Sequence, residues 1–169
     1  MINIVLFEPE IPQNTGNIMR TCAGTGAKLH LIKPFGFSLS ASAIKRSGVN
    51  YIENCDYTVY ENWDDFVSKN TDGVFCYLTR YGKKPHSEFD FSDTNKNLYL
   101  VFGKESTGIP KEILSKHLDE CARIPTNANI RALNLSNCVA LVLFEALRQQ
   151  DYPNLLRTEP FKGEDYLSE

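Results

Sequence analysis

This sequence has few histidines and no closely paired cysteines. These two features argue against disulfide-stabilised and metal-binding proteins. Its five cysteines are widely spaced, with none in a CxxC pair, so we expect free thiols in a reducing compartment. Its three histidines stand far apart, so we expect no metal site. No apolar run approaches the roughly 18 residues of a membrane span, and the N-terminus lacks the basic region of a signal peptide. The expected location is therefore the cytoplasm.

The signatures of common nucleotide-binding and hydrolytic folds are missing as well. Gly24 and Gly26 stand at the end of an expected helix and lack the third glycine of a dinucleotide-binding fingerprint. Gly103 and Lys104 are followed by Glu105, whereas a phosphate-binding P-loop needs Ser or Thr at that position. There is no GxSxG elbow. The missing signatures therefore argue against hydride transfer on a classical fold, phosphoryl transfer and hydrolysis.

The 169 residues, 42% of them hydrophobic and 23% charged, fit one ordinary domain. We expect this domain at residues 1–152, followed by an acidic tail at residues 153–169 that contains two prolines. The net charge is −3, but residues 1–50 carry +3 and residues 51–169 carry the remaining −6. A locally basic face can still hold phosphate, with ordinary scatter of surface charge as the alternative.

Short apolar runs alternate with helical segments along the chain. Strands are expected at residues 2–7, 29–32, 57–60, 74–78, 97–102 and 121–124, and helices at residues 15–25, 40–47, 63–69, 111–117 and 134–150. The polar stretch at residues 81–97 is expected to be a loop. This alternation predicts an α/β fold with a parallel sheet flanked by helices.

The first of three unusually polar segments is NTGNIMR at residues 14–20. We expect Asn14 to cap a helix that starts near Thr15. Asn14, Asn17 and Arg20 then share one broad face, with Arg20 about a turn and a half inside the helix, near amides that favour anions. The segment is either a seat for a phosphate or a reacting hydroxyl, or a cap followed by a surface arginine.

The second segment, LVFGKESTGIP at residues 100–110, leads from a buried strand into two glycines. Gly103 and Gly108 would let the main chain approach a ligand at the carboxyl end of the sheet, where open α/β folds bind ligands. Glu105 between them either holds a polar or cationic group or pins the loop. An ordinary turn into a helix started by Pro110 is the alternative.

The third segment, IPTNANIRALNLSN at residues 124–137, is rich in amide, hydroxyl and guanidinium groups and precedes an apolar helix. Asn134 or Ser136 is expected to cap that helix, which leaves the other polar residues unexplained. The helix is apolar from Cys138 to Phe144. We therefore expect it to be covered on more than one side, within the monomer or across a dimer.

In this order the three segments resemble the motifs of the SPOUT methyltransferase superfamily, and most closely those of the TrmL (YibK-like) tRNA (cytidine/uridine-2′-O-)-methyltransferases. The similarity covers residues 1–152. It implies a C-terminal trefoil knot, a homodimer, and S-adenosylmethionine bound by the knotted loops, with S-adenosylhomocysteine as product. Matched position by position, the cofactor-binding residues are Leu78, Thr79, Gly103, Glu105, Gly108, Ile124, Pro125, Ala132, Leu133 and Asn134. Among these, Leu78, Ile124 and Leu133 are expected to enclose the adenine.

The resemblance also implies methyl transfer to a ribose 2′-hydroxyl of tRNA, at the wobble nucleotide of the anticodon loop. Arg20 matches the arginine that lies near this hydroxyl in the family. A guanidinium stays protonated, so stabilising the forming alkoxide or binding the adjacent phosphate suits it better than acting as a base. Asn14 and Ser136 are expected to orient Arg20 or the ribose, and no metal is implied.

The expected RNA-binding surface is a basic one shared by two subunits. Its candidate residues are Lys28, Lys33, Lys45, Arg46 and Lys104. Two other functions stay open at this point. One is a SPOUT-like module that binds RNA without catalysis, and the other is a nucleotide-binding enzyme of a flavodoxin-like α/β type.

Overall fold

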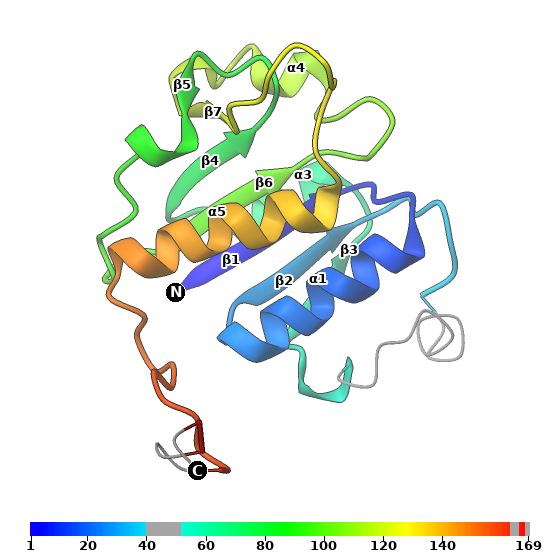
Figure 1. The fold of residues 1–169 in the computed structure, drawn as a ribbon. Coiled ribbons are helices and arrows are strands. Elements are labelled where there is room, and N and C mark those ends of the chain that lie inside the picture. The colour runs from blue at the N-terminus through cyan, green and yellow to red at the C-terminus, as the bar shows by residue number, and fades with distance from the viewer. Residues whose placement is uncertain (40–51, 163–165, 168–169) are drawn as a thin grey trace.

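In the part of the chain that the structure describes, seven strands, all paired in parallel, form one sheet in the order β3-β2-β1-β6-β4-β7-β5 (Figure 1). The strands are β1 (Ile2–Phe7), β2 (Lys28–Ile32), β3 (Tyr57–Tyr60), β4 (Val74–Leu78), β5 (Lys84–Pro85), β6 (Leu98–Phe102) and β7 (Cys121–Arg123). The computed structural model describes residues 1–39, 52–162 and 166–167, and the helix expected at residues 40–47 lies outside them. The predicted parallel α/β fold is confirmed.

The strand order reverses direction beside β1. From β1 the chain adds β2 and then β3 on one side, whereas β4 and later strands lie on the other side, beyond β6. All residues of β1 and of β6 are buried, which is typical of a parallel sheet covered on both faces. A reversal of this kind leaves a crevice outside the carboxyl ends of the strands, where α/β proteins bind their ligands.

Helices cover both faces of this sheet. The helices α1 (Pro12–Thr25) and α5 (Leu135–Gln149) lie side by side on one face, and α3 (Trp63–Lys69) lies on the other (Figure 1). The remaining described elements are α4 (Lys111–Leu114) and the 3-10 turns η1 (Ile52–Asn54), η2 (His86–Glu88) and η3 (Leu118–Glu120). None of the helices within the described ranges is long and apolar enough to cross a membrane.

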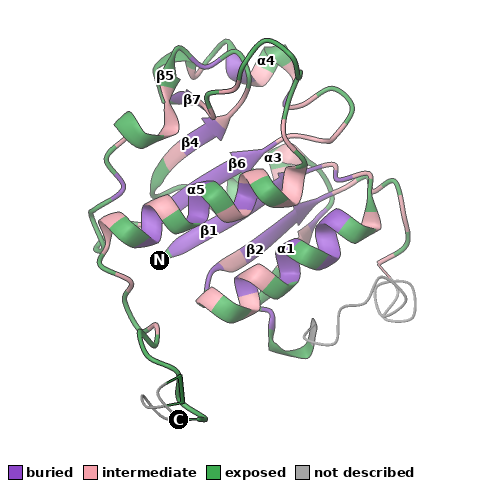
Figure 2. Ribbon diagram, in the orientation of Figure 1, coloured by how far each residue is buried: buried purple, intermediate pink, exposed green. Residues whose placement is uncertain are grey.

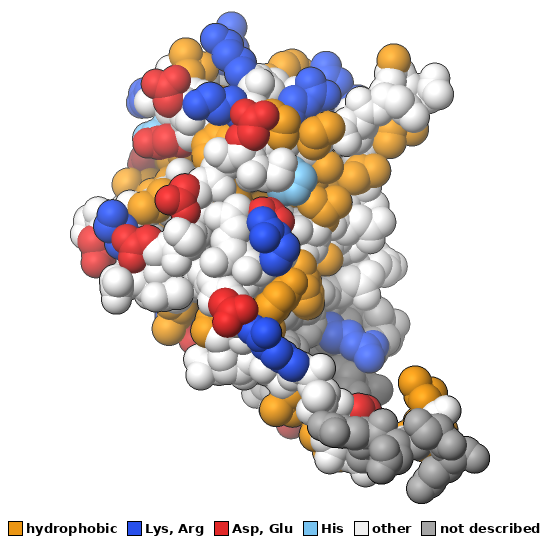
Figure 3. Space-filling view, turned by 60° about the vertical axis from the view of Figure 1, so that its left-hand side comes forward, with side chains coloured by type: hydrophobic (Ala, Val, Ile, Leu, Met, Phe, Trp, Pro, Cys, Tyr) orange, Lys and Arg blue, Asp and Glu red, His pale blue; other side chains and the backbone are white. Residues whose placement is uncertain are grey.

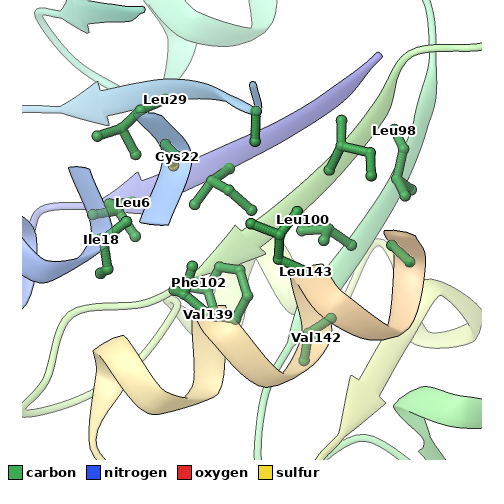
Figure 4. Packing of buried hydrophobic residues seen from close by; sticks show 14 of the residues in the cluster. Leu6, Ile18, Cys22, Leu29, Leu98, Leu100, Phe102, Val139, Val142 and Leu143 are labelled. Carbon is green, nitrogen blue, oxygen red and sulfur yellow. The ribbon is translucent and has the colours of Figure 1, made fainter. Parts of the chain in front are cut away.

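Two hydrophobic cores form on the two faces of the sheet. On the face of α1 and α5, Leu6 and Leu100 pack with Ile18 and Leu143 (Figure 4). On the face of α3, Val101 belongs to a second cluster. Because successive side chains of a strand point to opposite faces, each apolar run supplies both cores. Figure 2 shows the buried positions concentrated in the central strands and on the inner sides of α1 and α5.

The start of α1 differs from the sequence prediction. The helix begins at Pro12 with Ile11 as its N-cap, so Asn14 lies in the first turn and is not the cap. Proline suits this position because its fixed φ is helical and its missing N–H has no intrahelical acceptor there. The C-terminal end is as predicted, since α1 ends at Thr25 and Gly26 follows with a left-handed φ of 72°.

Two further predictions were wrong in detail. The stretch expected to be a loop at residues 81–97 contains η2 and β5, a strand of two residues that pairs with β7. A strand this short, containing a proline, leaves no alternating pattern to find. The helix expected at residues 111–117 ends at Leu114, with Ser115 as its C-cap.

A buried polar cluster borders the second core. His30, which is 2% exposed, contacts the hydroxyl of Tyr60 at 2.8 Å through Nδ1 and Oδ1 of Asn3 at 3.1 Å through Nε2. Its ring also meets the rings of Phe66 and Tyr99. Burial lowers the pKa of His30 to about 4. The imidazole is therefore neutral at pH 7, with both ring nitrogens in hydrogen bonds.

The segment after α5 contains no helix or strand in its described parts, residues 150–162 and 166–167. Tyr152 and Leu155, which stand on either side of the predicted boundary between domain and tail, both pack against the first core. The described contacts therefore continue a short way past residue 152.

Candidate functional site

A cavity of about 480 Å³ lies at the carboxyl ends of β4, β6 and β7. Its walls come from the loops that follow these three strands and from the first turns of α1 and α5. This is the edge of the sheet at which parallel α/β folds place their ligands. The volume falls within the range of small-molecule sites.

Most of the residues predicted to bind a cofactor line this cavity. They are Leu78, Thr79, Gly103, Glu105, Gly108, Ile124, Ala132, Leu133 and Asn134, joined by Asn14 from the predicted catalytic set. Pro125 and Ser136 are not among the lining residues. The structure thus brings all three polar segments to one place, and the roles of the individual residues stay predictions.

Side-chain hydrogen bonds connect the three segments through the buried Asn14. Its amide donates to Oε1 of Glu105 at 3.1 Å, and its Oδ1 accepts from the amide of Asn134 at 2.9 Å. Oδ1 of Asn134 in turn accepts from the backbone N–H of Ser136 at 2.9 Å and from its hydroxyl at 2.7 Å. Asn134 is thereby the N-cap of α5, one of the two caps that the sequence predicted.

Glu105 pins the loop, which is one of the two roles considered for it. Its carboxylate accepts from the backbone N–H of Glu10 at 2.8 Å and of Ile11 at 3.1 Å. In return, Glu10 accepts from the backbone N–H of Ser106 at 2.8 Å and from its hydroxyl at 2.9 Å. These hydrogen bonds lower the pKa of Glu10. The loops after β1 and β6 therefore hold each other at the mouth of the cavity.

Gly103 has a reason for being glycine besides the predicted approach of the main chain to a ligand. A Cβ at this position would lie 2.1 Å from the carbonyl carbon of Gly108 and 2.2 Å from the nitrogen of Ile109. The close approach is thus between two parts of the same loop, and the loop closes further with an N–H to O=C bond from Gly108 to Lys104 at 2.9 Å. Gly108 has a left-handed φ of 76° and open space around it.

Arg20 does not lie in the cavity. It is exposed on α1, eight residues after Pro12, and is absent from the lining. This places it about two turns into the helix, too far to share the N-terminal amides as predicted. The error follows from the assumed start at Thr15. Of the face shared by Asn14, Asn17 and Arg20, only Asn14 is buried.

The predicted basic surface is partly neutralised within the chain. Lys33 pairs with Glu61 at 2.7 Å, and Lys104 pairs with Glu8 at 2.6 Å. Lys45 and Arg46 lie outside the described residues. The sequence analysis did not link a second set of basic residues beside the cavity, namely Arg80, Arg123 and Arg131, with the aromatic Tyr81. Arg131 was noted only as part of the third segment, and Arg80 and Arg123 come from other stretches that only the fold brings beside it.

The chemistry of the cavity favours binding and positioning over covalent catalysis. Cys138 is the one thiol among the lining residues, and burial raises its pKa, so it is not a thiolate nucleophile at neutral pH. The described residues contain no group of three or more His, Cys, Asp or Glu that could hold a metal ion. Aliphatic Leu78, Ile124 and Leu133 provide an apolar wall beside the polar network of Asn14.

Sheet and cavity together define a parallel α/β protein with a cavity of small-molecule size, formed by three loops at the carboxyl ends of its strands. Comparison with known families narrows this class. The model of the SpoU rRNA methylase family matches residues 1–144. The chain belongs to this family.

Individual relatives agree with this membership. A curated relative from Geobacillus stearothermophilus, provisionally named tRNA (cytidine(34)-2′-O)-methyltransferase, is 48% identical over 154 residues, which are 91% of this chain and 98% of the relative. A solved structure described in terms of 2′-OH methylation of C/U34 on tRNA superimposes with a TM-score of 0.81 at 37% identity, covering 89% of this chain and 97% of that one. An rRNA methyltransferase from Sinorhizobium meliloti with bound AdoMet gives a TM-score of 0.75 at 25% identity, covering 87% of this chain and 56% of that one.

Proposed function

We propose that the protein is an S-adenosylmethionine-dependent tRNA ribose 2′-O-methyltransferase that acts on the wobble nucleotide, cytidine or uridine, of the anticodon loop. The similarity to the Geobacillus stearothermophilus relative and to the structure concerned with C/U34 supports this substrate. The observation that carries the proposal is the cavity, where the three family motifs meet. The unpaired nucleotides of such a loop expose the 2′-hydroxyl and the base edges to a protein. A cytoplasmic location follows from this substrate.

The residues of the cavity fit S-adenosylmethionine. About 480 Å³ accommodates a nucleoside with an amino-acid chain. Leu78, Ile124 and Leu133 offer apolar surfaces for the adenine, and the main chain around Gly103 and Gly108 lies at the wall. When bound, the cofactor supplies a methyl group on a positively charged sulfonium, which leaves as a neutral thioether. The protein therefore has to align the hydroxyl and help it lose its proton.

Arg20 is the proposed catalytic residue, with Asn14 and Ser136 as positioning residues. A guanidinium near the reacting oxygen stabilises the negative charge that develops on it. Because Arg20 is exposed on α1 and outside the cavity, it has to meet the reacting ribose from the rim or from a second subunit. Asn14 and Ser136 act through the hydrogen bonds that hold α1 and α5 together at the cavity.

We also propose that the chain pairs as a homodimer and that its C-terminal part is knotted. The outer side of α5 exposes Leu141 at 39% and Phe144 at 46%, which is the second apolar surface expected from the sequence. Pairing through α5 and the adjacent α1 would place Arg20 where two subunits meet. The knot is supported by membership of the family and by the way α5 returns to cover β1 and β6 after the chain has left β7.

Radiolabelled S-adenosylmethionine with total tRNA provides the test, followed by nucleoside analysis of the product. Methyl incorporation at the 2′-oxygen of the wobble nucleotide is the expected result. RNA that binds without incorporating label would instead identify an inactive RNA-binding module. Neither binding nor incorporation would favour a small-molecule enzyme of another α/β type.

A further inference from the structure

A second hollow, open to solvent, adjoins the cofactor cavity. We call it the arginine bay and define it by Arg80, Tyr81, Arg123, Ile130 and Arg131. All of these except Ile130 also belong to the wall of the cavity, so the two hollows are continuous. The bay has a volume of about 520 Å³, and its described lining contains no Asp or Glu. A strand of nucleic acid could therefore lie in the bay while one ribose enters the cavity.

Three guanidinium groups in the arginine bay lack an acidic partner. Among the residues that the structure describes, no carboxylate lies within ion-pair distance of Arg80, Arg123 or Arg131. Nε of Arg123 is buried and has no hydrogen-bond partner in the described part of the chain. Arg131 uses one amino group to hold the carbonyl of Ser106 at 3.0 Å, which fixes its side chain beside the cavity. Guanidinium groups in this state are donors for a phosphate.

An exposed aromatic ring accompanies these charges. Tyr81 is 69% exposed, and the guanidinium carbon of Arg80 lies 4.8 Å from the centre of its ring. Ile130, 48% exposed, adds an apolar surface to the same bay. Aromatic rings beside a basic groove bind unpaired bases by stacking, while the cations hold the backbone. The combination is typical of sites for single-stranded nucleic acid.

We propose that the arginine bay binds the RNA strand next to the reacting nucleotide, with Tyr81 stacked on an unpaired base and the arginines on flanking phosphates. This inference rests on the proposed function and deepens it, because it places the RNA on the side of the cavity formed by the loops after β4 and β7. In Figure 3, Lys and Arg side chains are present at the upper end of the molecule, the end that carries β5, β7 and α4 in Figure 1. The carboxylate of S-adenosylmethionine is an anion too, so its binding has to be measured alongside.

The test compares the binding of an anticodon stem-loop RNA to the full chain loaded with S-adenosylhomocysteine. Arg80→Ala is expected to weaken RNA binding about tenfold and to lower the slope of log K against log salt by about 0.7. Tyr81→Ala is expected to cost about tenfold and Tyr81→Phe less than about twofold, because a phenyl ring also stacks. Arg157→Ala is the matched control, since Arg157 pairs with Asp151 and lies in neither hollow. Calorimetry measures the cofactor affinity of all four variants alongside, because Arg80 and Tyr81 also border the cavity, and Arg157→Ala should match wild type in both measurements.

Unchanged RNA affinity in folded Arg80→Ala and Tyr81→Ala proteins would overturn the proposal. Loss of cofactor affinity with unchanged RNA affinity would also overturn it, by assigning the bay to the cofactor carboxylate. The proposed function is tested separately, by methyl transfer. Wild-type protein that methylates tRNA although the bay variants bind RNA normally contradicts the bay alone. Wild-type protein that transfers no methyl group although its RNA binding depends on the bay contradicts the proposed function alone.

Discussion

The amide of Asn134 donates to Oδ1 of Asn14 across 120 positions of sequence, at 2.9 Å. Through this bond the first turn of α1 meets the cap of α5. The second bond of Asn14, to Glu105, adds the loop after β6. One buried amide therefore sets the relative positions of all three segments that line the cavity, and its donor and its acceptor serve different partners.

Replacing Asn14 by aspartate should destabilise the protein and weaken cofactor binding. The change keeps the acceptor for Asn134 but removes the donor and places a carboxylate beside Glu105 in a site that is 5% exposed. A loss of about 1–3 kcal/mol in the free energy of unfolding is expected from urea titrations. Gln13→Glu is the control, because Gln13 lies one residue earlier on the exposed side of α1. Equal losses for the two variants would contradict the role given to Asn14.

Three glycine-to-alanine substitutions should change the free energy of unfolding by different amounts, and one of them should raise it. Gly103→Ala is expected to cost several kcal/mol and to impair cofactor binding, since its Cβ would meet the main chain of Gly108 at 2.1 Å. Gly108→Ala should cost about 1–2 kcal/mol, from its positive φ alone. Gly24→Ala, with no atom within 4 Å of its Cβ in α1, should stabilise by about 0.5–1 kcal/mol. Thermal or urea unfolding of the three proteins ranks them, and a Gly103→Ala protein as stable as Gly24→Ala would refute the packing argument.

Acid should destabilise the protein through His30 before most carboxylates titrate. The pKa of His30 is lowered from 6.5 to about 4 in the fold, so the unfolded chain takes up this proton first. The stabilising contribution is complete above about pH 6.5 and is lost as the pH falls toward 4, by about 3 kcal/mol in all. Glu145, whose pKa is lowered to about 2 from 4.5, loses its own contribution at lower pH. In urea titrations between pH 7 and pH 4, His30→Gln should depend less steeply on pH than wild type, and identical slopes would exclude His30 as the cause.

A glutamate at position 142 of α5 and one at position 144 should have different effects on folding and assembly. Val142 is fully buried in the first core, so Val142→Glu should unfold the chain. Phe144 is 46% exposed on the outer side of the same helix. Phe144→Glu should leave a folded protein that sediments as a monomer, whereas wild type is expected to sediment as a dimer at micromolar concentration. A wild-type monomer at that concentration would remove the proposed interface.

Substitutions of Arg20 distinguish a catalytic role of this residue from a purely structural one. Arg20→Ala should reduce turnover about a hundredfold to ten-thousandfold if the guanidinium stabilises the reacting oxygen. Arg20→Lys should be nearly as slow, since lysine keeps the charge and loses the planar fork. Cofactor affinity should change less than a few-fold in both, because Arg20 does not line the cavity. A folded, cofactor-bound Arg20→Ala protein that keeps more than about a tenth of wild-type activity would end the catalytic assignment.

Continuous apolar runs made the strands predictable, because burial on both faces leaves a strong signal in residues such as those of β1 and β6. The start of α1 was not predictable in the same way. The amides that lead into it are held by Glu105, a residue more than ninety positions away. Capping rules consider only residues that are close in sequence, and on that basis they favoured Asn14 as the N-cap.

The functional site, like the fold, could be predicted from the sequence only in part. The three polar segments were found because each combines glycines or amides with the end of a strand, and the cavity contains most of the residues named in them. Arg80 and Arg123 carried no such signal, and Arg131 was noted only as part of the third segment. Only the adjacency of the loops after β4 and β7 makes the three arginines a group.

The order of the strands also determines when the central strands can pair and become covered during synthesis. β1 is made first but pairs with β6, and the helix α5 that covers both is made last among the helices. A nascent chain that ends before residue 135 therefore has apolar residues of β1 and β6 without their cover. Such long-range closure slows folding and prolongs exposure to aggregation. We therefore expect β1 to stay sensitive to protease in nascent chains until α5 has emerged from the ribosome.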